Sequence, residues 1–113
     1  MSIKGLEMTE GIQFDVHTPL NFSVRCTEQW WQYVSTIKHP ILEDRVEDII
    51  ATLTEPQEVR RSTKDPAVLL FYRDSAPRLL CVVVRQDNGE GFLITAYPTD
   101  SFKKGEIVWS ASE

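Results

Sequence analysis

The stretch Leu79-Leu80-Cys81-Val82-Val83-Val84-Arg85-Gln86-Asp87-Asn88-Gly89-Glu90-Gly91-Phe92-Leu93-Ile94-Thr95-Ala96-Tyr97 decides the fold of this chain. Two apolar runs, residues 79–85 and 91–97, flank a polar link that suits a chain reversal. The Asn-Gly step in this link favours a β-hairpin turn, because both residues accept positive φ angles. The stretch therefore predicts two antiparallel strands joined by a tight hairpin.

Successive side chains on a strand point to opposite faces, so the second run divides into two sets. The even-numbered residues from Phe92 to Ala96 would face a core, and the odd-numbered ones from Leu93 to Tyr97 would face away. Thr95 and Tyr97 would then lie side by side, as a small site for an anionic ligand requires. Thr and Tyr are also favoured in ordinary half-exposed strands, so both interpretations stay open.

Further strands are expected around this hairpin, at residues 58–62, 68–73 and 106–109, with a turn at residues 74–78. Near the N-terminus, residues 12–16 and 20–24 alternate apolar and polar side chains and predict another hairpin. Residues 1–10 are expected to form a poorly ordered lead-in.

Two helices are expected between the N-terminal hairpin and the later strands. The first would run from Thr27, a candidate N-cap, to Ile37. The second would run from Pro40 to Leu53, with one apolar stripe and its acidic residues turned to solvent. The stripe comprises Ile41, Leu42, Val46, Ile49, Ile50 and Leu53.

These elements predict an α+β fold in a single domain, residues 1–113. An N-terminal hairpin and two helices would pack on one face of a twisted antiparallel sheet of four to five strands. With 113 residues and 42% hydrophobic content, the chain is long enough to bury a core without crosslinks.

Composition limits the partners and the compartment. The net charge of −5 argues against binding nucleic acid through bulk electrostatics, although residues 57–104 carry eight basic and six acidic side chains. Cys26 and Cys81 are expected to be buried free thiols, and their spacing predicts no metal site. Without a long apolar run or a signal peptide, a cytoplasmic protein with no membrane span is expected.

Two kinds of side chain are candidates for chemistry. His39, just before the second helix, can exchange a proton near neutral pH, or can simply cap that helix. Arg60 and Arg61 share one predicted strand, so only one of them can face a given site, and the pattern does not say which. Arg73 and Arg85 end further strands, where arginines either bind phosphate or serve solubility.

The order of these segments from His39 to Trp109 resembles the barnase–EndoU–colicin–RelE superfamily of small phage and bacterial domains. The order is a His at a helix start, an acidic helix, the Arg60-Arg61-Ser62 strand, the strands at 68–73 and 79–85, the Thr95-Ala96-Tyr97 strand and a final strand that ends in Trp109. The match covers about the last two-thirds of the chain and leaves out the N-terminal hairpin.

The resemblance implies RNA cleavage without metal or other cofactor, in which the 2′-hydroxyl attacks the adjacent phosphate. It also implies a toxin-like protein whose partners are RNA and an antitoxin or other protein. By position, His39 would act as the general acid or base, and Arg60 or Arg61 with Arg73 would hold the phosphate. Thr95 and Tyr97 would orient the phosphate. The expected substrate contacts are Arg85, Lys103 and Lys104.

An alternative is a binding module of the same fold that holds RNA or a protein without cutting it. Trp30, Trp31 and Trp109 suit this alternative if they are exposed, since aromatic residues dominate binding energy at interfaces. If they are buried, they are core residues instead. The two hypotheses differ in one geometric expectation, because catalysis requires His39 to face Thr95 and Tyr97.

Overall fold

The hairpin at Asn88 and Gly89 forms the middle of the fold, as the sequence predicts. In the computed structural model, which describes residues 11–111, β5 (Arg78–Asp87) and β6 (Glu90–Thr99) pair antiparallel on either side of this turn. Asn88 and Gly89 have φ angles of 53° and 82°, the conformation that a two-residue hairpin turn needs.

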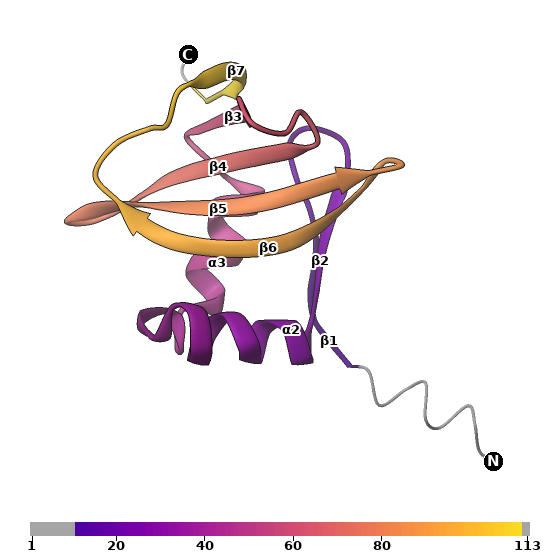
Figure 1. The fold of residues 1–113 in the computed structure, drawn as a ribbon, viewed down its shortest axis with the longest axis vertical. Coiled ribbons are helices and arrows are strands. Elements are labelled where there is room, and N and C mark those ends of the chain that lie inside the picture. Colours follow the sequence, from indigo (N-terminus) through magenta and orange to yellow (C-terminus); the bar gives the residue numbers. More distant parts are fainter. Residues whose placement is uncertain (1–10, 112–113) are drawn as a thin grey trace.

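Seven strands form one curved sheet within the described residues, in the order β1-β2-β6-β5-β4-β3-β7 (Figure 1). All neighbouring strands are antiparallel except β2 and β6, which pair in parallel over two positions. The remaining strands are β1 (Ile12–His17), β2 (Ser23–Thr27), β3 (Glu58–Ser62), β4 (Val68–Ser75) and β7 (Gly105–Ser110).

The prediction of an antiparallel sheet of four to five strands is wrong, because the N-terminal hairpin joins the sheet and makes it a mixed one. Gly91 makes this junction possible. A β-carbon on Gly91 would lie 2.7 Å from the Phe22 ring and 3.0 Å from the Val24 side chain, so any other residue would push the hairpin away. The loop of this hairpin is also longer than expected. The Thr18 hydroxyl donates to the Phe22 carbonyl within the loop, and β2 begins only at Ser23.

The helices are shorter than predicted and do not form two regular helices packed on the sheet. The first begins as α2 (Glu28–Tyr33) and continues as a π-helical turn, η1 (Val34–Lys38). Thr27 caps it as predicted, because its hydroxyl accepts the Trp30 N–H at 3.1 Å. The second is divided into a 3₁₀ turn, η2 (Pro40–Leu42), and α3 (Val46–Thr54).

The break between η2 and α3 avoids two unfavourable like-charge pairs. One continuous helix would place Glu43 over Glu47 and Asp44 over Asp48, and like charges four residues apart are unfavourable. In the structure the chain turns at these residues instead. Arg45 binds the Asp48 carboxylate at 2.8 Å and so neutralises part of this charge.

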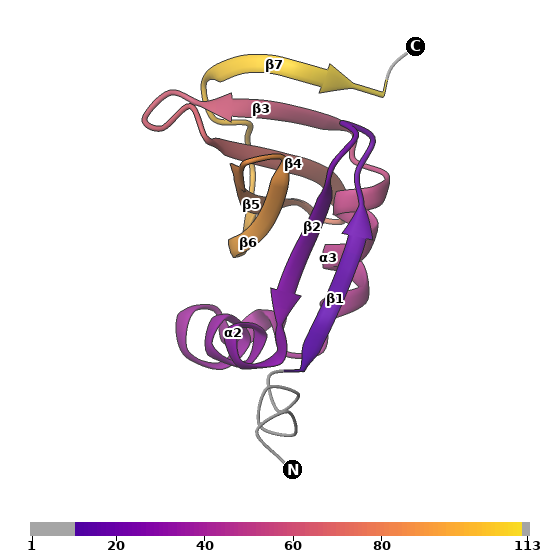
Figure 2. The ribbon, with the colours of Figure 1, turned by 90° about the vertical axis from the view of Figure 1, so that its right-hand side faces the viewer.

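The main core lies between the sheet and the helices, and it occupies one face of the sheet. Figure 2 shows α3 and the β1–β2 hairpin on the same side of strands β4, β5 and β6. The largest fully buried side chains of this core include Phe71, Leu42, Ile49, Leu53, Leu69 and Leu80. A second, smaller cluster of Leu70, Tyr72 and Cys81 lies on the opposite face, which none of the described helices covers.

A β-bulge in β6 changes which residues of that strand face the core. Val83 pairs with Thr95 and Val84 pairs with Leu93, so Ile94 has no partner on β5. Leu93 and Ala96 are consequently both buried in the main core, although they are three residues apart. The expected division of faces is therefore correct for Thr95 and Tyr97 but wrong before the bulge, where Leu93 is buried.

Three smaller expectations can be compared with the structure. Cys26 and Cys81 are buried and free, which confirms the prediction for the thiols. Within residues 11–111, no helix has the length and apolar character to span a membrane. The lead-in expected at residues 1–10 lies outside the described residues.

Ile49 and Ile41 test the core assignment, because the sequence places both in one apolar stripe but the structure separates them. Ile49 is fully buried, whereas Ile41 is 61% exposed. We expect Ile49→Ala to lower the free energy of unfolding by about 2–5 kcal/mol. Ile41→Ala should change it by less than about 0.5 kcal/mol in the same urea titration. Equal losses in the two variants would contradict this core.

Candidate functional site

The uncovered face of the sheet carries a groove of about 490 Å³. Its floor consists of apolar side chains from the central strands β4 and β5. Its walls come from β6, from the loop between β3 and β4, and from the loop between β6 and β7. The lining residues are Ser62, Thr63, Lys64, Val68, Leu70, Val83, Thr95, Tyr97, Lys103 and Lys104.

The groove is positively charged. Lys64 comes from the loop between β3 and β4, and Lys103 and Lys104 come from the loop between β6 and β7. Among the described residues that line it, none is acidic. Three ammonium groups around an apolar floor favour an anionic ligand that also has a flat or apolar part. Sequence reasoning missed Lys64, because a single lysine in a loop has no distinguishing pattern.

Tyr97 is in contact with two of the other predicted site residues, Lys103 and His39. The Lys103 ammonium lies 5.6 Å from the centre of its ring, within the range of a cation–π contact. Burial raises the pKa of the Tyr97 phenol well above its ordinary value. The phenol therefore stays neutral near pH 7, so it can donate or accept a hydrogen bond but cannot serve as a base.

His39 lies beside Tyr97, one of the two residues that the hypothesis of catalysis requires it to face. The centres of the two rings are 6.2 Å apart, and their planes are inclined by 41°. The π-helical turn η1 places His39 there, because its backbone N–H donates to the Val34 carbonyl five residues earlier. The imidazole is partly buried and has no hydrogen bond to any residue in 11–111. It does not line the groove itself but borders it through Tyr97.

Thr95 lines the groove, but its hydroxyl is not presented to a ligand. Oγ1 of Thr95 is buried and has no hydrogen-bond partner within the described part of the chain. An unpaired buried hydroxyl costs about 1–3 kcal/mol of stability. The structure thus brings Thr95 to the expected face without giving its hydroxyl the expected contact.

The two adjacent arginines lie on opposite faces of the sheet, and neither belongs to the groove lining. Arg60 pairs with Leu70 on the uncovered face, but its guanidinium already binds the Glu58 carboxylate and the Lys103 carbonyl, the latter at 2.8 Å. Arg61 points the other way and bonds to the Pro66 carbonyl at 2.9 Å.

The two remaining arginines are not part of the groove lining. Arg73 bonds to the Glu55 carbonyl at 2.7 Å, at the end of α3 on the covered side of the sheet. Arg85 forms an ion pair with Asp65 at 2.8 Å. The structure therefore does not bring together the arginine pair expected to hold a phosphate, and the cations at the groove are lysines.

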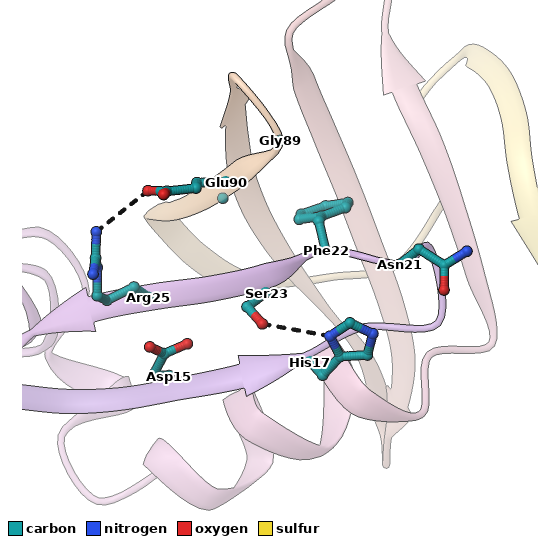
Figure 3. A pocket seen from close by; sticks show the side chains of 9 residues that line it. Asp15, His17, Asn21, Phe22, Ser23, Arg25, Gly89 and Glu90 are labelled. Carbon is teal, nitrogen blue, oxygen red and sulfur yellow. Dashed lines mark hydrogen bonds and ion pairs between the residues drawn. The ribbon is translucent and has the colours of Figure 1, made fainter.

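A second hollow, of about 390 Å³, lies between the β1–β2 hairpin and the β5–β6 turn. Figure 3 shows Arg25 and Glu90 bridging it as an ion pair, with His17 beside Ser23 at its other end. Carboxylates and cations are mixed here, and none of the residues singled out for catalysis contributes to the lining. The groove on the uncovered face is the better candidate.

No protein-family model, curated protein or solved structure matches this chain. Its function therefore has to be argued from the chemistry of the groove, because a fold by itself does not determine an activity.

Because the buried hydroxyl of Thr95 is unpaired among the described residues, we predict that removing it stabilises the protein. Thr95→Val keeps the shape of the side chain and removes the buried hydroxyl, so we expect the free energy of unfolding to rise by about 1 kcal/mol. Thr27→Val is the matched control, because it removes a hydroxyl that caps α2, and it should lower stability by about 1 kcal/mol. Chemical denaturation measures both, and a loss of stability in Thr95→Val would contradict the burial described above.

Proposed function

We propose that the groove binds RNA and that the protein cleaves it without metal, through attack of a 2′-hydroxyl on the adjacent phosphate. One observation supports this most strongly: the imidazole of His39, which has no hydrogen bond to another described residue, lies beside Tyr97 at the border of a groove whose described charged lining residues are lysines. A proton carrier and a set of cations are the two parts that this reaction requires. The proposal takes the protein to act in the cytoplasm.

In the proposed reaction His39 accepts the proton of the 2′-hydroxyl, and the 2′-oxygen forms a bond to phosphorus. Lys103 and Lys104 stabilise the negative charge that develops on the phosphate oxygens. The bond to the 5′-oxygen then breaks, which leaves a cyclic phosphate, and the leaving oxygen takes a proton from the Lys103 ammonium. Exchange with solvent returns both side chains to their starting protonation states.

The lysines take the role that the family resemblance gives to arginines. Arg60 lies on the uncovered face outside the groove lining and is paired with Glu58, and Arg73 lies on the other side of the sheet. A lysine offers a point charge on a flexible stem rather than a bidentate fork, so it neutralises a phosphate with less demand on its orientation.

A second candidate function of the same groove is RNA binding without cleavage. The observation that favours it is the position of His39, which borders the groove through Tyr97 and is not one of its lining residues. In that case the three lysines and the apolar floor would still bind a nucleotide chain. A protein partner, which the family resemblance also implies, would compete for this face.

Cleavage and binding can be separated with the two histidines of the chain. We expect the wild-type protein to cleave single-stranded RNA in excess chelator and to leave cyclic phosphate ends. His39→Ala should slow cleavage by about 10²–10⁴-fold, the usual contribution of one general acid or base. His17→Ala is the matched control, because His17 lies in the second hollow and should leave the rate unchanged.

Each alternative outcome has a defined meaning. Equal cleavage by wild type and His39→Ala would remove His39 from the mechanism. Binding without cleavage would favour the binding module, and the absence of both would contradict the proposed function. A requirement for added metal would exclude the reaction as written.

A further inference from the structure

Residues 101–104, which carry two of the groove lysines, are held in place by side chains from β3 and β4. The backbone N–H of Lys103 donates to the Tyr72 hydroxyl at 2.9 Å, and its carbonyl accepts from the Arg60 guanidinium at 2.8 Å. The Phe102 ring packs edge-on against the Tyr72 ring, with centres 4.7 Å apart. The Arg60 guanidinium also lies over the Phe102 ring, at 5.0 Å.

We infer that Tyr72 and Arg60 act as positioning residues that aim the Lys103 and Lys104 ammonium groups into the groove. This inference rests on the proposed function of the groove as an RNA site. Fixing both the N–H and the carbonyl of Lys103 sets the direction of its Cα–Cβ bond, and Nζ of this side chain lies 5.6 Å from the centre of the Tyr97 ring. A lysine in an untethered loop would have to be ordered when RNA binds, which weakens binding.

The chemistry of the two positioning residues suits this role. Tyr72 is fully buried, yet its hydroxyl reaches the loop and accepts the Lys103 N–H. Burial raises the pKa of Tyr72 to about 12, so the phenol remains neutral at the pH of any assay near 7. Arg60 is paired with Glu58, so it can hold the loop while its own charge is compensated.

The alternative is that these contacts only stabilise the fold. A structural role would change the melting temperature, but it would not change how strongly a folded protein binds RNA or how that binding depends on salt. The affinity and its salt dependence therefore distinguish the two explanations. Tyr72→Phe is the most direct variant, because it removes only the hydroxyl that accepts from Lys103.

The experiment compares wild type, Tyr72→Phe and the control Tyr33→Phe, since Tyr33 is 44% exposed on α2 and away from the groove. The probe is a short single-stranded RNA with 2′-O-methyl groups, which cannot be cleaved. We expect Tyr72→Phe to raise the Kd about threefold to tenfold, the effect of losing one hydrogen bond. The slope of log Kd against log salt concentration should decrease by about the amount that corresponds to one lost phosphate contact.

Amide hydrogen exchange of Lys103 tests the positioning itself without any ligand. We expect its exchange rate to rise at least about fivefold in Tyr72→Phe and to stay unchanged in Tyr33→Phe. If the rate does not rise, the positioning is absent. If it rises while the Kd and the salt slope stay at wild-type values, the contacts are merely structural and the inference is wrong.

The test also covers a variant that does not fold and a wild type that does not bind. Should Tyr72→Phe fail to fold, Phe102→Ala replaces it, because Phe102 is 38% exposed and its loss loosens the same loop from the surface. Should the wild type not bind the RNA, the proposed function fails, and the exchange rate of Lys103 alone then decides whether the loop is held as described.

Discussion

The β-bulge at Ile94 is the constraint on which both faces of the sheet depend. Without it, Leu93 would point to the uncovered face together with Thr95 and Tyr97, and the main core would lose its side chain. The Ile94 carbonyl accepts a hydrogen bond from the Trp30 indole at 3.1 Å. This bond ties helix α2 to the bulge.

The same geometry explains why two distant segments meet at Tyr97. Because η1 lies against β6, the turn that comes after η1 brings His39 to one side of the Tyr97 ring. The loop after β6 returns across the uncovered face and brings Lys103 to that ring as well. The helices cover the other face, so the groove stays open, and its charge comes from loops rather than from strands. A single tyrosine at the end of a rigid strand therefore organises the candidate site.

Local signals in the sequence predicted many of the strands and turns, but they could not predict contacts between segments that are far apart in the chain. The Asn-Gly turn and the strands around it follow from alternation along the chain, whereas the meeting of His39 with Tyr97 was expected only from the family resemblance. The parallel pairing of β2 with β6 depends on the close approach of Phe22 to Gly91, which no local pattern reveals. The bulge at Ile94 likewise leaves no mark in an apolar run. The bond from Arg60 to the Lys103 carbonyl could not be foreseen, since the two residues are 43 positions apart.

The central claim is that the uncovered face of the sheet is the RNA-binding surface, and backbone NMR tests it most directly. A 2′-O-methyl RNA would be titrated into labelled protein while the amide shifts are followed. The account predicts that shifts concentrate in residues 62–64, 95–97 and 102–104 and at His39, around the groove. Shifts confined to α3 or to the β1–β2 hairpin, or no shifts at all, would contradict it.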